Sequence, residues 1–316
     1  MLKHHTAIVL GAGASYPYGF SLGSELKDRI VENLRKDEWF RETLSASGHT
    51  KSEMDTLASR LDTSPQASID AFLDRAREFV DLGRKCITLQ IAAEERDVFR
   101  RQVRPVSKDR GPCWYGELFR SYGNKPEHFR PDRLLVVTFN YDRSLEWFFR
   151  TRLIADFGLK EQEARSIVSS LGIIHVHGWL GDLPFGEVPN APQLTEVAKG
   201  IRIISDAESD EHPAFRNSRH FILGKAEVVA FLGFGFHADN VRRLRISNHY
   251  PPGTPGAMFN HERDLPLPKK RVLGTTIGMT PKQVDAAERM FEVEVKLSRD
   301  NRPLAEFARD DVLVPA

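Results

Sequence analysis

One pattern recurs along this chain: a short apolar run is followed directly by glycine or polar residues, and then by a stretch with helical character. Apolar runs without polar alternation are typical of parallel strands that are buried on both faces. The strands predicted in this way are residues 6–10, 134–137, 173–178, 228–232 and 271–275. Strands that alternate with helices indicate an α/β fold with a mainly parallel sheet.

The polar and glycine-rich motifs follow the ends of predicted strands. They occupy residues 11–15, 138–142, 175–178 and 233–240. In parallel sheets, ligands bind beyond the carboxyl ends of the strands, where the strand order switches. We therefore expect these four motifs to converge on one edge of one sheet.

The segment between the first two strands, about residues 40–125, is predicted to be a helical insertion within a single domain of residues 1–316. Apolar residues recur there at three- and four-residue spacing, with charged residues between them. These apolar positions are Ile69, Phe72, Leu73, Ala76, Phe79 and Val80. The pattern extends through Ile87 and Ile91, with Gly83 as a weak point. We expect a second lobe or a cover over the edge of the sheet.

The composition argues against several classes of protein. The 316 residues include 45 Lys and Arg against 44 Asp and Glu, so the net charge of +1 argues against an electrostatic nucleic-acid binder. Two cysteines, Cys86 and Cys113, cannot form a disulfide framework or a four-cysteine zinc site. No run reaches the roughly 20 apolar residues of a transmembrane helix.

The first residues imitate a secretory signal peptide only faintly. The apolar stretch is short, and it leads directly into the glycine pair at residues 11–13. The low cysteine content agrees with a reducing compartment. We expect a cytoplasmic protein that binds neither nucleic acid nor a membrane.

The first glycine turn is a candidate phosphate cradle. Gly11 and Gly13 lack a Cβ, so the backbone can approach a pyrophosphate, and the following helix offers N–H groups. Ser15 could add a hydroxyl donor. The segment is not the dinucleotide fingerprint GxGxxG, because Tyr16 stands where the third glycine belongs. A plain tight turn remains an equal alternative.

The second motif places Asn140 and Asp142 just beyond a buried strand. Such side chains can fix ribose hydroxyls, a water molecule or a carboxamide. The alternative is that Asp142 caps the helix that begins near Arg143. Considered alone, the motif favours the cap for Asp142 and leaves Asn140 open.

The third motif contains His175 and His177, which strand alternation would place on one face. We expect no metal site, because no cysteine or HExxH motif accompanies the pair. A histidine beside a glycine at the end of a strand suits a general base. The alternative, a packed core histidine, is favoured for His175 over His177.

The fourth motif follows the strand 228–232. Gly233 and Gly235 could admit an adenosine against the backbone, and Asn240 could cap the next helix or hold a ribose. No G-x-S-x-G elbow directly follows a predicted strand, and the chain has no Walker phosphate loop, which weakens the interpretations as a triad hydrolase or an NTPase.

Taken together and in this order, the motifs resemble the Sir2 family, and more closely the Sir2-like domains of bacterial anti-phage defence proteins. The matching segments are GAGAS at 11–15, PYGFSLGSEL at 17–26, SIDAFL at 68–73, TFNYDRSLE at 138–146, HVHG at 175–178 and FLGFGF at 231–236. The resemblance implies a Rossmann-like sheet with helices on both faces, an inserted lobe, and NAD as the bound molecule.

The resemblance also implies roles for individual residues. Gly11, Ala12, Gly13 and Ser15 would hold the NAD phosphates and the nearby ribose. Asn140 would contact the nicotinamide ribose and place the nucleophile, and His177 would be the catalytic histidine. Asp142 would lie near the carboxamide, while Gly233 and Phe234 would face the adenosine.

Two departures from the family pattern favour an enzyme that consumes NAD over a protein deacylase. Deacylating sirtuins carry a zinc on four cysteines in the small lobe, and they have an IPDFR-type segment after the first motif; this chain has neither. We therefore predict an NAD glycohydrolase that releases nicotinamide and ADP-ribose and depletes NAD in anti-phage defence, without a metal. The alternatives are a deacylase or ADP-ribosyltransferase, or a non-catalytic sensor of NAD or ADP-ribose. A partner subunit or self-assembly would provide the switch.

Overall fold

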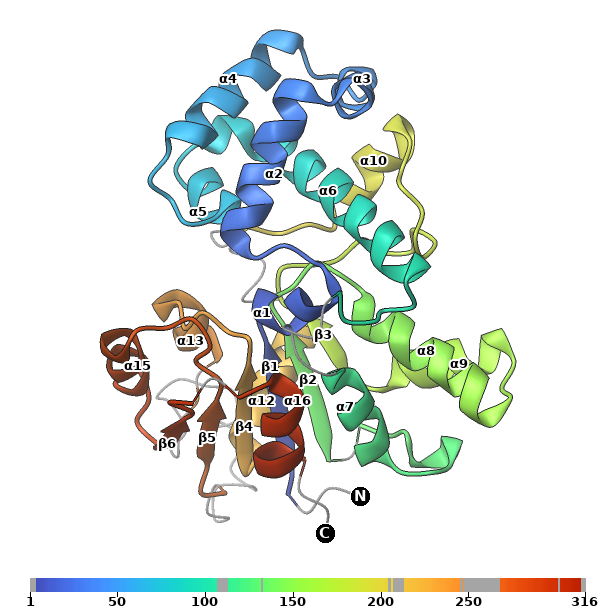
Figure 1. Ribbon diagram of the computed structural model, residues 1–316, viewed down its shortest axis with the longest axis vertical. Coiled ribbons are helices and arrows are strands. Elements are labelled where there is room, and N and C mark those ends of the chain that lie inside the picture. The colour runs from blue at the N-terminus through green and yellow to red at the C-terminus, as the bar shows by residue number, and fades with distance from the viewer. Residues whose placement is uncertain are drawn as a thin grey trace.

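Six parallel strands form the centre of the molecule. The computed structural model describes residues 4–106, 113–131, 133–203, 206, 213–244, 246, 268–300 and 302–313. The strands are β1 (Thr6–Leu10), β2 (Leu134–Thr138), β3 (Ile173–His175), β4 (Val228–Leu232), β5 (Arg271–Gly274) and β6 (Glu294–Leu297). They lie in the order β3-β2-β1-β4-β5-β6 (Figure 1). The predicted α/β, Rossmann-like fold is confirmed.

The strand order switches beside β1. The chain passes from β1 to β2 and β3 on one side, and then returns to β4 on the other side of β1. A crevice for ligands is expected at such a point, outside the carboxyl ends of the strands.

The five predicted strands are present, with one correction and one addition. β3 ends at His175 and does not continue to Gly178, so alternation along a strand does not relate His175 to His177. β6 was not predicted, because Glu294 and Lys296 interrupt its apolar residues and leave it only partly buried at the edge of the sheet.

Helices cover both faces of the sheet, and neighbouring residues of β1 point to opposite sides. Ile8 and Leu10 pack into one apolar cluster with α7 (Trp114–Tyr122), α8 (Ser144–Phe157) and α16 (Leu304–Phe307). Ala7 and Val9 pack into another with α12 (Pro213–Gly224), α13 (Ala238–Leu244) and α15 (Pro281–Glu288). Both faces of the sheet are therefore buried, which explains why its central strands are apolar without interruption.

A third apolar cluster builds a helical lobe above the sheet (Figure 1). Its helices are α2 (Gly23–Lys36), α3 (Glu38–Ala46), α4 (Lys51–Thr63), α5 (Ile69–Leu73), α6 (Val80–Arg100) and α10 (Ala191–Ala198). The lobe therefore begins before residue 40, and it includes α10 from beyond β3. By contrast, α7 lies within the predicted insertion but packs against the sheet.

The helical pattern from Ile69 to Ile91 forms helix over most of its length, but not a single helix. It is divided into α5 and α6, because Ala76 leaves the helical conformation with φ −114° and ψ 65°. Gly83 lies inside α6, where a Cβ would come within 2.5 Å of Leu73 Cδ1. The glycine thus allows α5 to fold back onto α6.

The remaining elements are short, apart from α9. They are α1 (Ala12–Ser15), η1 (Tyr16–Tyr18), η2 (Arg77–Phe79), η4 (Pro126–His128), α9 (Glu161–Ser170) and η5 (Ala308–Val312). Among the described helices, none combines the length and the apolar character needed to cross a bilayer.

Candidate functional site

A pocket of about 420 Å³ lies where the carboxyl ends of the strands meet the helical lobe. The sheet side contributes eight of the ten predicted site residues, which are Gly11, Ala12, Ser15, Asn140, Asp142, His177, Phe234 and Asn240. The lobe side contributes Gly23, Ser24, Ser68, Asp70 and Ile91. The motifs therefore converge at one edge of the sheet, as their positions after the strands predicted.

Gly13 and Gly233, the other two predicted residues, do not line the pocket. They hold two turns together instead: the N–H of Gly13 donates to the carbonyl of Gly233 over 2.9 Å, and Gly233 has φ +57°. A Cβ on Gly11 would lie 2.6 Å from the Gly233 carbonyl oxygen, and one on Gly233 would lie 2.1 Å from Ala14 N. These glycines are thus explained by close backbone packing, without a phosphate.

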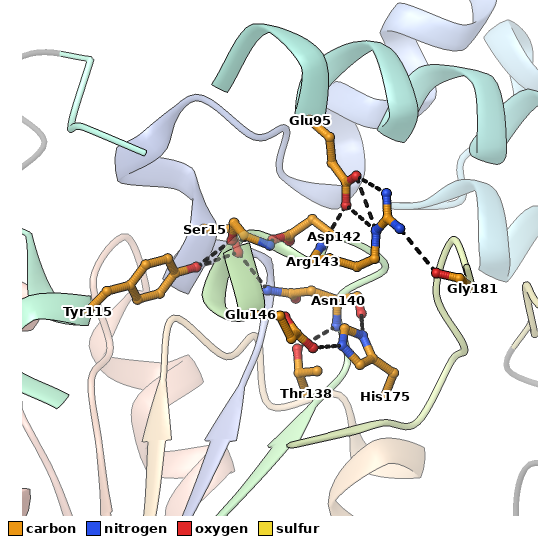
Figure 2. Close-up of polar contacts among 11 residues, drawn as sticks. Ser15, Glu95, Tyr115, Thr138, Asn140, Asp142, Arg143, Glu146, His175 and Gly181 are labelled. Atoms are coloured by element: carbon orange, nitrogen blue, oxygen red, sulfur yellow. Dashed lines mark hydrogen bonds and ion pairs between the residues drawn. The ribbon is translucent and has the colours of Figure 1, made fainter. Parts of the chain in front are cut away.

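Asn140 is held by the turn that follows β1 (Figure 2). Its side-chain Nδ2 donates to the Gly11 carbonyl and to Ser15 Oγ, both over 3.0 Å. Its backbone N–H donates to Thr138 Oγ1 over 3.0 Å. Among the described residues, Oδ1 of Asn140 has no hydrogen-bond partner, so the amide is fixed at one end and unpaired at the other.

Asp142 lies in a buried network with Ser15, Tyr115 and Ser144. It accepts hydrogen bonds from the backbone N–H of Ser144, over 3.1 Å, and from the Ser144 hydroxyl. The Tyr115 hydroxyl lies 2.7 Å from Ser144 Oγ and 3.4 Å from Ser15 Oγ (Figure 2). Burial raises the pKa of Asp142 above its usual range. The N-cap position of α8 is Arg143, so Asp142 is not the cap residue itself; it accepts the N–H of Ser144, the first residue of the helix, from one position earlier.

His175 is fully engaged by its neighbours. Its Nδ1 lies 2.9 Å from the Asn140 carbonyl oxygen, and its Nε2 lies 2.6 Å from Glu146 Oε1 (Figure 2). Burial alone would lower the pKa of His175, but the Glu146 carboxylate outweighs burial and raises it. The ring also stacks on Trp179. His175 is the packed histidine that the sequence favoured.

His177 has the opposite environment. It is 5% exposed, and its Nδ1 has no hydrogen-bond partner among the described residues. The ring lies edge-on to Phe139 and faces the pocket. Burial, together with the positive charge of Arg243, lowers the pKa of His177 to about 4. His177 is therefore a neutral imidazole at neutral pH.

The motif after β4 supplies an aromatic wall and one amide. Phe234 packs against Phe139 with ring centroids 5.1 Å apart, and both line the pocket. Asn240 is not the cap of its helix, because α13 begins at Ala238. Its Oδ1 is buried, with no hydrogen-bond partner in the part of the chain that the structure describes.

Asp70 and Tyr141 were not predicted as site residues. Asp70 is on α5 of the lobe, and its carboxylate accepts a hydrogen bond from the Tyr141 hydroxyl, so the two walls of the pocket touch here. Burial raises the pKa of Asp70 to about 6. In the sequence, Asp70 looked like one of the charged residues between apolar helix positions. Only the fold shows that it faces the pocket.

A buried ion pair also joins the lobe to the sheet. Arg143 follows β2 and Glu95 belongs to α6; Arg143 Nη2 lies 2.6 Å from Glu95 Oε2, and both side chains are at most 2% exposed. Burial raises the pKa of Glu95, whereas the hydrogen bonds from Arg143 oppose that change. Arg143 also donates to the Gly181 carbonyl over 3.1 Å (Figure 2). The pair fixes the turn that carries Asn140 and Asp142.

The pocket thus combines an amide, a neutral imidazole, a carboxyl group and backbone N–H groups near the start of α2. This set can bind hydroxyl and phosphate oxygens and can accept a proton. Within the described residues, no group of three or more His, Cys, Asp or Glu side chains is arranged to hold a metal ion. Comparisons of the sequence with protein-family models and with curated proteins found no match.

Proposed function

We propose that this protein is an NAD glycohydrolase, which cleaves NAD with water to nicotinamide and ADP-ribose. The observation that carries the proposal is the meeting of Asn140 and His177, from the ends of two strands, in one pocket between sheet and lobe. Both residues belong to segments that resemble the Sir2 family. The role in anti-phage defence rests on that resemblance alone.

The dimensions and chemistry of the pocket suit a dinucleotide. The first turn of α2, at Gly23 and Ser24, lines the pocket and supplies N–H groups that can bind a diphosphate. Phe234 offers an aromatic wall for a base or a nicotinamide ring. The volume of about 420 Å³ falls within the usual range of small-molecule sites.

The reaction makes modest demands on acid catalysis. Nicotinamide leaves as a neutral molecule from a cationic nitrogen, taking the electron pair of the C–N bond, so its departure requires no strong acid. The oxocarbenium-like centre needs stabilisation and a positioned water. Asn140 is held rigidly through its Nδ2, and its unpaired Oδ1 can orient a ribose hydroxyl or that water.

Two groups can accept the proton that the attacking water loses as its oxygen bonds to the ribose carbon. His177 is neutral at neutral pH and lines the pocket, but a pKa of about 4 makes it a weak base. Asp70, with a pKa of about 6, is better matched to neutral pH. We assign hydrogen bonding with the substrate to His177, and acceptance of the proton to Asp70.

The test is an NAD turnover assay that follows nicotinamide by chromatography, performed with purified protein and with its defence partner if one is identified. Asn140→Ala and His177→Ala are each expected to lower turnover at least 100-fold. The matched control is His220→Ala, which removes an exposed histidine of α12 that does not line the pocket. Unchanged turnover in both site variants would refute the proposal.

The same assay separates the alternatives. A deacylase or ADP-ribosyltransferase would release nicotinamide only when an acylated peptide or a protein acceptor is present. A sensor would bind NAD or ADP-ribose in calorimetry without turnover. Light scattering with and without a candidate partner would show whether the switch lies in assembly.

A further inference from the structure

A second cavity, of about 670 Å³, lies beyond His175, at the edge of the sheet formed by β3. Its walls come from α8, α9 and the loop of residues 179–185. The cavity shares no lining residue with the pocket that contains Asn140 and His177. It is therefore a separate place at which a small molecule could bind.

Two side chains on the wall of this cavity carry a buried polar atom without a partner. Glu146 is 6% exposed; its Oε1 is bound to His175, whereas its Oε2 has no hydrogen-bond partner in the described part of the chain. Arg150 Nη1 donates to Glu161 over 2.6 Å, but its Nε–H is likewise unpaired. Unpaired buried groups of this kind cost free energy.

The two unpaired atoms are complementary, and the residues that carry them are neighbours on one helix. Glu146 and Arg150 are four residues apart on α8, and residues at this spacing are neighbours on one face of a helix. One offers a hydrogen-bond acceptor and the other a donor. A ligand edge with one N–H donor beside one acceptor would satisfy both.

The rest of the cavity suits a flat ring. Trp179 lines it with 39% of its surface exposed, and its indole stacks on His175 with centroids 5.2 Å apart. Phe185 is also in the wall, and the guanidinium carbons of Arg143 and Arg150 lie 4.7 and 4.8 Å from its ring centroid. Asp182 and Arg165 line the cavity as well, so it presents charges of both signs.

We propose that this cavity binds a small, uncharged aromatic ring whose edge carries an N–H donor beside an acceptor. Adenine and primary aromatic amides share this edge. The ring lies against Trp179, the donor pairs with Glu146, and the acceptor pairs with Arg150. The proposal does not rest on the proposed NAD cleavage.

The cavity is connected to the first pocket through His175. Glu146 Oε1 and the Asn140 carbonyl oxygen bind opposite nitrogens of the same imidazole, 2.6 and 2.9 Å away (Figure 2). A ligand N–H that donates to Glu146 reduces the negative potential of this carboxylate at His175, and so changes the hydrogen bond between His175 and the backbone of Asn140. An occupant of the second cavity is therefore an effector of the first pocket.

The first test follows the fluorescence of the full chain with two matched pairs of probes. Adenosine is paired with purine riboside, which lacks the amino group, and benzamide is paired with methyl benzoate, an uncharged ester that lacks the N–H donor. At least one donor-bearing probe is expected to quench Trp179 saturably, with half-saturation at or below about 1 mM. Its partner is expected to bind at least tenfold more weakly. The two pairs distinguish the adenine edge from the amide.

Variants locate the quenching. Trp179→Phe should abolish it, whereas Trp39→Phe, which replaces an exposed tryptophan that does not line the cavity, should leave it unchanged. Arg150→Met removes the unpaired N–H and should weaken binding at least tenfold. Arg165→Met is the control, because Arg165 also pairs with Glu161 and lines the cavity, yet has no unpaired buried atom among the described residues. It should change binding less than twofold.

The second test observes the connection directly. In histidine-labelled protein, the ring resonances of His175, assigned with His175→Gln, should shift when the binding probe is added. No quenching by either donor-bearing probe, or equal binding of the members of each pair, would overturn the site. Equal effects of Arg150→Met and Arg165→Met would do the same. Quenching without any shift of His175 would overturn its role as an effector site.

Discussion

His175 and His177 are two residues apart, yet they lie in opposite environments. Both nitrogens of His175 are bound and its pKa is raised, whereas Nδ1 of His177 has no partner among the described residues and its pKa is lowered to about 4. The division follows from the end of β3 at His175, after which the chain turns. A histidine whose bonds are satisfied supports the structure, while an unsatisfied one beside a pocket is available to a ligand.

The largest expected effect distinguishes the two histidines by stability. His175→Ala leaves the buried Glu146 carboxylate without its partner, so we expect a loss of about 3–5 kcal/mol in the free energy of unfolding. His177→Ala should cost less than about 1 kcal/mol, since the removed ring satisfies few polar groups. Urea denaturation measures both variants. Equal losses in the free energy of unfolding would show that the two histidines do not differ in their contribution to stability.

The second prediction uses the opposite pKa shifts. His177 binds a proton more readily in the unfolded chain than in the folded one. Its titration should therefore lower the free energy of unfolding by about 3 kcal/mol as the pH falls from about 6.5 to 4. His175 has the reverse sign: its contribution is present at low pH and is lost as the pH rises through its raised pKa. In His177→Gln, the free energy of unfolding should depend less steeply on pH on the acidic side. A variant curve parallel to that of the native chain would contradict the assignment.

Two glycines extend the comparison, because Gly233 and Gly235 are also two residues apart. A Cβ on Gly233 would meet the backbone of Gly13 and Ala14 at a positive φ, whereas one on Gly235 would meet nothing within 4 Å. Gly233→Ala is expected to cost about 2–3 kcal/mol, and Gly235→Ala less than about 0.5 kcal/mol. Thermal unfolding of the two variants tests this difference. Similar melting temperatures would mean that the contact between the two turns is not needed.

The smallest expected effect concerns Asp70. Its raised pKa means that ionisation disfavours the folded state as the pH rises from 3.8 to about 6. The shift corresponds to about 3 kcal/mol at pH 7, but Asp70→Asn also weakens the hydrogen bond from Tyr141, so it should stabilise the protein by about 1 kcal/mol at pH 7 and change little at pH 4. If Asp70 accepts a proton in the proposed reaction, the same variant lowers NAD turnover at pH 7. Stabilisation with full turnover would leave Asp70 with a structural role only.

The sheet could be predicted because each of its central strands is marked by a short run of neighbouring residues in the sequence. Uninterrupted apolar runs predicted the central strands, and the residues that follow them predicted the position of the pocket. β6 was missed, since an edge strand with Glu294 and Lys296 lacks that pattern. The break between α5 and α6 lies at Ala76, and the close packing of α5 against α6 requires Gly83 beside Leu73, which is a contact in space. Neither this contact nor the placement of Asp70 in the pocket can be derived from the spacing of apolar residues in the sequence.

The sequence predicted where the candidate site lies better than it predicted why particular residues are there. Asn140 and His177 lie in the pocket, but the glycines at 11 and 13 are explained by their contact with Gly233. A glycine pair after a strand is compatible with either cause. The unpaired atoms that mark His177 and Asn240 appear only when all neighbours are known.

The ion pair between Arg143 and Glu95 also limits which substitutions the sequence can accept during evolution. One partner is in the lobe and the other follows β2, and neither can be replaced singly without leaving a charge away from water. Related chains should therefore exchange positions 95 and 143 together, for example to two apolar residues. Covariation between positions 95 and 143 among related sequences would show that selection preserves the contact between the lobe and the sheet.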